Sequence, residues 1–259
     1  MLIDTHAHYD DEKYAEDLAA CLDDVQAAGV SYIVNAAQNI ATTHKIMALS
    51  KKFPYIYGTA GIHPHEAGSA ALTDYEEIRR LTAKGAAAGH KIVAIGETGL
   101  DYYYDFSPRD VQKENFTRHI EIALEVGLPL VVHDRDAHED CLELLDKHGA
   151  FGGKVVFHCY SGSLEFAQIL AGKGCYFSFG GAITFKNAKK FPEILRGIPK
   201  DRLMLETDCP YMTPEPHRGT RNTSAYLPLV AGKMAEILGK SVSEVETLTS
   251  ANARTFYGI

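Results

Sequence analysis

Residues 92–135 contain the stretch that decides the fold, because two apolar runs are separated there by a helical segment. The first run is Ile92-Val93-Ala94-Ile95-Gly96-Glu97-Thr98-Gly99, and the second is Leu128-Pro129-Leu130-Val131-Val132-His133-Asp134-Arg135. Both runs are almost continuously apolar before their polar ends, which is typical of parallel strands covered on both faces. Between them, one helix face carries Phe116, Ile120, Ala123 and Leu124, and Gly127 marks the helix end. The stretch therefore predicts a strand–helix–strand unit.

The same pattern recurs along the chain. Six further runs begin near Leu2, Tyr32, Ile56, Val155, Cys175 and Leu203. The eight runs start about 29 residues apart, which is the size of one strand–helix unit. Residues 14–25 have helical spacing, and Ser241 with Glu244 forms a capping-box pattern that begins a last helix through Phe256. We predict a single (β/α)8 TIM barrel over residues 1–259 with an extra C-terminal helix; a doubly wound open sheet is the alternative.

Composition excludes several classes of protein. The chain has 259 residues, of which 46% are hydrophobic and 23% charged, as in globular proteins rather than disordered ones. With 26 Lys and Arg against 34 Asp and Glu, the net charge of −8 argues against non-specific adhesion to nucleic acid or anionic lipid. We find no secretory signal, no apolar run long enough for a membrane span and no Cys-x-x-Cys pair among five cysteines, so we expect a cytoplasmic protein without a disulfide framework.

Polar residues end six of the eight predicted strands. In a barrel of this kind the carboxyl ends of the strands meet at one rim, where catalysis takes place. The residues at these ends are His6, His8, His63, Glu97, His133, His158 and Asp208. Any one of them alone would more often be a hydrogen-bonded core imidazole, a loop acid or a turn residue. Together they would be costly to bury without a cation, and imidazoles with carboxylates suit zinc, manganese, iron, cobalt or magnesium.

Two further acids have the sequence parity of the rim residues. Asp4 precedes His6 by two residues, and Glu206 precedes Asp208 by two. Side chains two apart on a strand leave the same face, so both acids are predicted one layer deeper in the barrel. There they would orient the ligands from a second shell, or form a buried polar pair.

The sequence resembles the TatD family of metal-dependent deoxyribonucleases, within the amidohydrolase-like barrels, nearly from end to end. The resemblance rests on blocks that occur in order, most of them at strand ends: Asp4-Thr5-His6-Ala7-His8, Gly61-Ile62-His63-Pro64-His65, Ile95 to Tyr102, Ser107-Pro108-Arg109-Asp110, His133-Asp134-Arg135, His158 to Gly162, Ser178 to Phe185 and Leu205 to Pro210. A single His-x-His pair is weak evidence, whereas this ordered series is specific.

The resemblance implies a site for two divalent ions, which would be Mg, Mn or Zn. His6, His8 and Asp208 would hold one ion, His133 and His158 the other, and Glu97 would bridge them. We predict a 3′–5′ exodeoxyribonuclease that hydrolyses single-stranded or frayed DNA with a metal-bridging hydroxide, in which Glu97 and Asp208 are the catalytic residues and Asp208 accepts the proton. No obligate protein partner is evident.

Three residues are predicted to contact the substrate: His63 at the scissile phosphate or leaving oxygen, Arg135 as a phosphate clamp, and Arg221 in the loop after the last strand. Lys and Arg exceed acids by three between Ile183 and Arg221, which gives an acidic protein a local basic surface. The aromatic residues of segment 102–106 would stack on an unpaired base or pack their own loop.

Two alternatives remain open at the sequence level. The same site would serve an ester or amide hydrolase, such as an aminoacyl-tRNA deacylase, because an activated water attacks a carbonyl as well as a phosphorus. A non-catalytic metal-binding barrel is the second alternative, although such a relative would be expected to lose ligands first.

Overall fold

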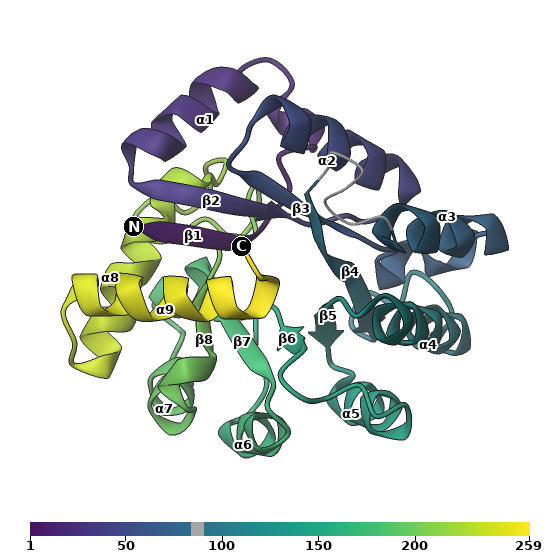
Figure 1. Ribbon diagram of the computed structural model, residues 1–259. Helices are drawn as coiled ribbons and strands as arrows, with labels where there is room; N and C mark the ends of the chain where they lie inside the picture. Colours follow the sequence, from purple (N-terminus) through teal and green to yellow (C-terminus); the bar gives the residue numbers. More distant parts are fainter. Residues whose placement is uncertain (84–90) are drawn as a thin grey trace.

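The computed structural model describes residues 1–83 and 91–259, and in them eight parallel strands alternate with helices (Figure 1). The strands pair in chain order from β1 to β8. Their bounds are β1 Leu2–Ala7, β2 Val30–Asn35, β3 Ile56–Ala60, β4 Ile92–Asp101, β5 Leu130–Arg135, β6 Val155–Phe157, β7 Tyr176–Phe179 and β8 Leu203–Leu205. Each strand begins within two residues of a predicted run, which confirms the strand–helix repeat.

Beyond the end of β8 the sheet closes on itself. Ala7 and Cys209 form an isolated parallel bridge, the Asp208 N–H donates to the His6 carbonyl at 2.9 Å, and the His8 N–H donates to the Cys209 carbonyl at 2.8 Å. The predicted TIM barrel is therefore confirmed. The closing bonds also hold the backbone of three rim residues together, so closure of the barrel and construction of its rim depend on the same contacts.

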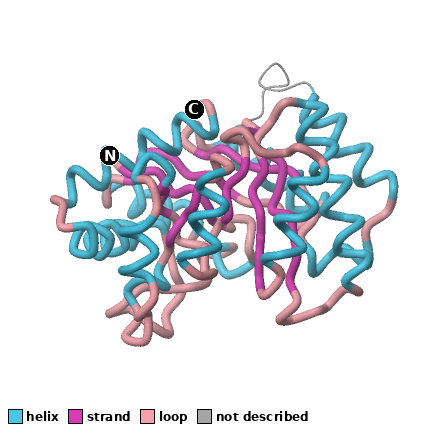
Figure 2. The backbone as a smooth tube through the Cα atoms, turned by 90° about the horizontal axis from the view of Figure 1, so that it is seen from below, coloured by secondary structure: helices cyan, strands magenta, loops and turns pink. Residues whose placement is uncertain are grey.

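Helices surround the strands (Figure 2). The α-helices in the described residues are α1 Leu18–Ala27, α2 Ile40–Lys52, α3 Leu72–Ala83, α4 Arg109–Val126, α5 His138–Lys147, α6 Leu164–Gly172, α7 Phe191–Gly197, α8 Leu227–Leu238 and α9 Val242–Tyr257. Short 3₁₀ turns are η1 Glu12–Tyr14, η2 Pro64–Ser69, η4 Gly181–Thr184, η5 Lys200–Arg202 and η6 Ser224–Tyr226. The predicted Gly127 helix stop and the Ser241–Glu244 capping box are both present. None of the helices in the described residues is long and apolar enough to cross a membrane.

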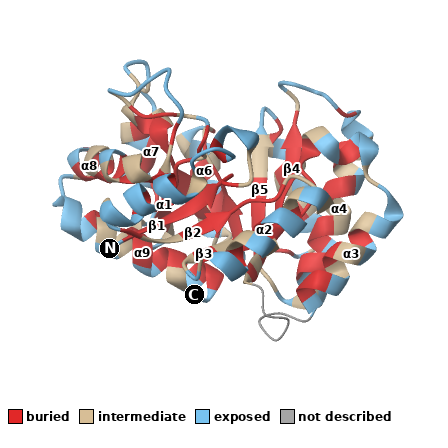
Figure 3. Cartoon of the chain, turned by 90° about the horizontal axis from the view of Figure 1, so that it is seen from above, coloured by how far each residue is buried: buried red, intermediate tan, exposed pale blue. Residues whose placement is uncertain are grey.

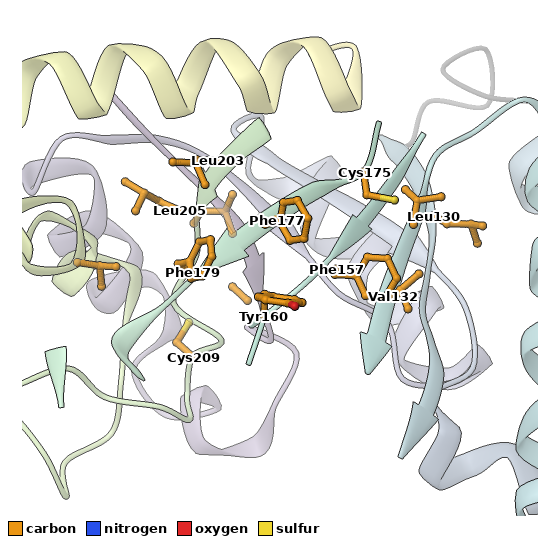
Figure 4. Close-up of a cluster of buried hydrophobic side chains, with 14 of the residues drawn as sticks. Leu130, Val132, Phe157, Tyr160, Cys175, Phe177, Phe179, Leu203, Leu205 and Cys209 are labelled. Atoms are coloured by element: carbon orange, nitrogen blue, oxygen red, sulfur yellow. The ribbon is translucent and has the colours of Figure 1, made fainter. Parts of the chain in front are cut away.

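Two apolar clusters account for the almost continuously apolar strands, because successive side chains of a strand enter one cluster and then the other. The larger cluster lies between strands and helices, and Figure 4 shows part of it, with side chains such as Leu130, Val132, Phe157 and Phe177. The smaller cluster lines the inside of the barrel with Ile3, Val34, Ala94, Val131, Val156, Tyr176 and Met204. Residues of α9, namely Ala253, Phe256 and Tyr257, pack against this inner cluster, so the predicted extra helix covers one end of the barrel (Figure 1).

The side chains that point into the barrel form an apolar layer, and the next inward-pointing side chains along the same strands form the rim. His133 lies two residues beyond Val131, His158 two beyond Val156, and Glu206 two beyond Met204. Because side chains two apart share a face, the apolar inner layer is followed by a polar one at the carboxyl ends. The amino end of the barrel is therefore closed by apolar packing and α9, whereas the carboxyl end presents titratable side chains.

Candidate metal centre

Glu97 lies at the centre of the rim, and two glycines of β4 allow it to do so. Gly96 and Gly99 have φ angles of +139° and +133°. A Cβ at Gly96 would lie 2.6 Å from the Val131 carbonyl oxygen, and one at Gly99 would lie 2.0 Å from the His133 carbonyl oxygen. The Gly-Glu-Thr-Gly sequence is thus required for β4 to run against β5, and Glu97 is only 3% exposed there.

Five imidazoles from four other strand ends surround the Glu97 carboxylate. Its Oε2 atom lies 3.1 Å from His6 Nε2 and 3.7 Å from His8 Nε2. Its Oε1 atom lies 2.8 Å from His158 Nε2, 3.0 Å from His133 Nδ1 and 3.4 Å from His63 Nε2. The two oxygens of one carboxylate therefore face two different groups of imidazoles.

Asp208 completes the group around Oε2. Its Oδ1 atom lies 3.4 Å from His8 Nε2 and 3.9 Å from His6 Nε2. The residue has a φ of +57°, a strained conformation for a residue other than glycine and one that is found at functional sites. Despite burial, contact with His8 and His6 keeps the pKa of Asp208 below its usual value.

The residues present fit divalent cations. Burial opposes charge on Glu97, yet the facing imidazoles hold its pKa well below the usual value. His6 behaves in the opposite way, because burial and the neighbouring His158 lower its pKa to about 4. Imidazole nitrogen and carboxylate oxygen without thiolate are the donor set of zinc, manganese and related ions. His6, His8 and Glu97 bring three such donor atoms within 4.8 Å of one another.

Outer partners decide which nitrogen carries a proton in three of the imidazoles, those of His8, His133 and His63. His8 Nδ1 lies 3.0 Å from the Ala36 carbonyl, which only accepts, so Nδ1 donates and Nε2 is the nitrogen that a cation would take. His133 Nε2 lies 3.0 Å from Asp101, which leaves Nδ1 for a cation. Burial lowers the pKa of His133, but Asp101 and Glu97 together raise it to about 9. In both rings the inner nitrogen faces Glu97, and it would offer its lone pair to a cation that replaced the proton there.

His63 has the opposite tautomer. Its Nδ1 accepts the His65 N–H at 3.2 Å, as the N-cap of η2. Burial lowers the pKa of His63 to about 4, so the ring is neutral and its hydrogen is on Nε2, 3.4 Å from Glu97. Although His63, Glu97 and His133 are close enough to hold an ion, His63 presents an N–H donor there instead of a lone pair.

The two predicted deeper acids differ in position. Glu206 contacts the site: its carboxylate accepts the Ser178 hydroxyl at 2.5 Å and the Cys159 N–H at 2.6 Å, and it lies 3.8 Å from His158 Nδ1. Burial raises the pKa of Glu206 to about 7. Glu206 thus lies beside the outer nitrogen of His158, one layer below the rim as predicted, but without a hydrogen bond to the ring.

Asp4 does not reach an imidazole ring. Its carboxylate accepts hydrogen bonds from the Thr207 N–H at 3.0 Å, from the Ser224 hydroxyl at 2.6 Å and from the His6 backbone N–H at 3.3 Å. The pairing register of β1 with β2 shifts between Asp4 and Ala7, and Ile3 is the residue that joins the inner cluster. Strict alternation from His6 back to Asp4 was therefore a wrong basis for its position, and Asp4 holds backbone segments together.

Of the three predicted substrate residues, two line the cavity of the site and one does not. His63 and Arg135 line one cavity of about 520 Å³ with Glu97, His133 and Asp208. Arg221 is outside this lining. Its guanidinium forms a bidentate ion pair with Asp17 at 2.7 and 2.8 Å and also donates to the Lys13 carbonyl. Arg221 therefore holds the loop after β8 against η1 and the start of α1.

Asp101 and His65 are functional candidates that the sequence reasoning missed. Asp101 Oδ2 lies 3.0 Å from His133 Nε2 and 2.8 Å from His65 Nε2. Burial opposes its ionisation, yet these two imidazoles lower the pKa of Asp101. The signal was available, because both residues lie in the quoted blocks Gly61–His65 and Ile95–Tyr102, but nothing in the sequence shows that β4 continues as far as Asp101.

At the carboxyl ends of the strands of this TIM barrel, imidazoles and Asp208 surround the Glu97 carboxylate. This combination of fold and site is typical of one class of protein, the metal-dependent hydrolases. Residues 3–258 match the model of the family described as TatD related DNase. The chain belongs to this family and is a metal-dependent hydrolase of the TatD type.

Individual relatives cover the whole chain. It is 41% identical over 259 residues to a Bacillus subtilis (strain 168) protein named uncharacterized metal-dependent hydrolase YabD, with 100% of both chains covered. It is 30% identical to the Escherichia fergusonii protein named 3′-5′ ssDNA/RNA exonuclease TatD, over 100% of this chain and 99% of that protein. The crystal structure of YJJV, a TatD homologue from Escherichia coli K12, superposes with a TM-score of 0.93 at 27% identity, covering 100% of this chain and 98% of that one.

Proposed function

We propose that this protein is a divalent-metal-dependent phosphodiester hydrolase that removes nucleotides from the 3′ end of single-stranded or frayed DNA. The family description and the exonuclease names of some relatives support a nucleic-acid substrate. The alternative of an ester or amide hydrolase uses the same centre and differs in the bond that is cleaved.

The observation that carries the proposal is the Glu97 carboxylate within its ring of imidazoles. We assign His6, His8 and Asp208 to one ion at the Oε2 side and His133 and His158 to a second ion at the Oε1 side, with Glu97 shared. Divalent ions bound there supply an acidified water and neutralise the charge of a phosphoryl group.

The chain's own residues then have separate tasks. Asp208 is 18% exposed at its side chain and reaches the cavity, so its carboxylate is the proton acceptor. The Nε2–H of His63 donates to a phosphoryl oxygen or to the leaving oxygen. Arg135 lines the same cavity and offers a forked guanidinium, which suits a phosphate better than the point charge of a lysine.

Basic residues beyond the rim offset the overall negative charge. Lys186, Lys189 and Lys190 follow β7 and Arg218 follows β8, close to the end where a substrate would enter. Arg218 packs over the ring of Phe185 at 3.8 Å. These loops occupy the position where barrels of this type commonly bind phosphate, which supports a polyanionic substrate.

The test uses single-stranded oligonucleotides labelled at the 5′ or the 3′ end, with the protein reconstituted in turn with Mg, Mn and Zn. Wild type should shorten the 5′-labelled strand in single-nucleotide steps. Glu97→Ala and His133→Ala should abolish cleavage with unchanged circular dichroism, whereas His44→Ala, at a half-exposed histidine of α2, should retain it. Full activity of either centre variant, or turnover of aminoacyl-tRNA with none of DNA, would refute the proposal.

A further inference from the structure

The loop that follows β4 presents large aromatic rings to solvent beside the metal centre. Tyr103, Tyr104 and Phe106 are 58%, 56% and 69% exposed. They follow β4, whose pairing with β5 ends at the pair of Asp101 and Arg135. Figure 3 shows this loop as exposed. A folded protein gains nothing from exposing three such rings side by side, so a cluster of this kind indicates a binding surface.

Polar contacts hold this aromatic loop (residues 102–106) in one conformation. The Asp101 carboxylate accepts the backbone N–H groups of Tyr103 at 3.1 Å and Tyr104 at 2.9 Å. Gln112 of α4 accepts the Asp101 N–H and donates to the Asp101 and Ser107 carbonyls. The rings are therefore carried on a fixed backbone, which is what a preformed contact surface requires.

The aromatic surface is continuous with the metal centre through His65. The His65 ring lies 5.4 Å from the ring of Tyr104, 4.8 Å from that of Phe106 and 6.1 Å from that of His133, measured between centroids. Tyr104 lines the same cavity as Glu97 and Asp208. The surface thus begins at the wall of the cavity that contains the centre.

A cation flanks the same surface. The Arg135 guanidinium lies 4.7 Å from the Tyr103 ring centroid, and Arg135 also lines the cavity. Asp134, its neighbour in sequence, pairs with His138 at 2.6 Å, and none of the ion pairs among the described residues involves Arg135. Aromatic faces next to a cation that is free to bind phosphate are the combination with which proteins hold single-stranded nucleic acid.

We propose that Tyr104 and Phe106 form a stacking surface for the base of the nucleotide next to the scissile phosphate, with Arg135 on its phosphate. This inference rests on the proposed function and names the part of the substrate that the protein recognises. Stacking accepts any base because every base has a π face, so the surface favours an unpaired strand end without sequence preference. A paired base would first have to leave its stack.

The test combines loss of the rings with loss of the base. Tyr104→Ala with Phe106→Ala should raise KM about ten-fold on an ordinary single strand, with kcat within about two-fold of wild type. On a strand whose nucleotide beside the scissile phosphate is abasic, wild type should show the same rise and the double variant no further one. Tyr104→Phe keeps the ring and should raise KM less than Tyr104→Ala does. Leu124→Ala, which removes an exposed apolar side chain of α4, is the control and should behave as wild type.

Distinct results would overturn the inference. An equal additional rise in KM on the abasic strand would show that the rings do not contact the base. Unchanged KM with an altered sedimentation coefficient would make the surface a contact between copies of this chain. If wild type cleaves no strand, the proposed function fails, and anisotropy of a labelled hexanucleotide then tests the surface alone, with about ten-fold weaker binding expected for the double variant and equal binding disproving it.

Discussion

At the scale of single residues, the outer hydrogen-bond partner of an imidazole decides what its inner nitrogen offers, as His8, His133 and His63 show. His8 and His133 give their outer N–H to an acceptor, so that their inner nitrogen would be the one to bind a cation, whereas His63 accepts on its outer side and turns an N–H toward Glu97. Rings of identical composition on one carboxylate are thereby divided into ligands and a donor. The hydrogen-bond partners outside the centre are consequently as important as the distances inside it.

Asp101→Asn should weaken metal binding about 10- to 100-fold without unfolding the protein. The amide keeps the shape of the carboxylate and can still accept hydrogen bonds from the loop N–H groups. It removes, however, the negative charge that strengthens His133 as a metal ligand. Calorimetric titration of metal-free protein measures the affinity. Asp134→Asn is the matched control, because that carboxylate pairs with His138 on the same rim; equal affinities for Asp101→Asn and wild type would contradict the prediction.

His63→Ala should lower kcat about 10²- to 10³-fold while the metal content stays at the wild-type value, because the ring donates a hydrogen bond and does not bind an ion. Metal analysis of the dialysed protein, together with single-turnover rates, separates the two roles. His158→Ala serves as the comparison and should lose metal as well as rate. A lost equivalent of metal in His63→Ala would mean that the ring is a ligand.

At the scale of elements, the sequence predicted the eight strands and their polar ends because apolar runs and strand parity are local properties. The six proposed ligands and Glu206 follow directly from that parity. The position of Asp4 does not follow from parity, since a register shift in β1 interrupts the alternation. The ion pair of Arg221 in the loop after β8 could not be predicted, since its partner Asp17 is distant in sequence. Asp101 was missed because the length of β4 beyond Glu97 depends on its pairing with β5.

Helix α4 supplies the fixed support for the end of β3. His119 Nε2 accepts the Ile62 N–H at 3.0 Å, and its Nδ1 donates to the Asn115 carbonyl at 2.7 Å; Asn115 also donates to the Ile62 carbonyl at 2.9 Å. Both nitrogens of this buried ring are used only if it is neutral, and burial lowers the pKa of His119 to about 4. The backbone that presents His63 thus depends on an uncharged imidazole.

His119 should make the protein less stable in mild acid. The unfolded ring takes up a proton near pH 6.5 and the folded ring only near pH 4, so the free energy of unfolding falls as pH decreases through this window, by about 3 kcal/mol in total. His119→Gln retains an acceptor and does not titrate. Urea unfolding at pH 7 and pH 4.5 should therefore show a smaller loss for the variant, and an identical loss would exclude His119 as a source.

At the scale of the whole molecule, the two ends of the barrel have opposite requirements. The carboxyl end holds Glu97 and its imidazoles out of water, which costs free energy that bound cations offset. Removing metal with a chelator should therefore lower the melting temperature, and readdition at about 100 times the Kd should restore about 2.7 kcal/mol. Calorimetric scans of the chelated and reloaded protein measure this; a melting temperature that does not respond to metal would contradict occupation of the centre.

The amino end should contribute to stability without affecting catalysis. Phe256 of α9 is 6% exposed, and its ring lies 5.0 Å from that of Tyr176, where it closes the inner cluster opposite the metal centre. Phe256→Ala leaves a cavity at that end and should cost about 3 kcal/mol, while kcat/KM stays within about two-fold because the strands between them remain paired. Val242→Ala, at an exposed position of the same helix, should change the unfolding free energy by less than about 0.5 kcal/mol. Denaturant unfolding and the oligonucleotide assay on the same samples measure both quantities. A fall in kcat/KM in proportion to the lost stability would contradict this prediction. It would mean that packing under α9 also positions the rim residues, so that the two ends of the barrel are structurally coupled.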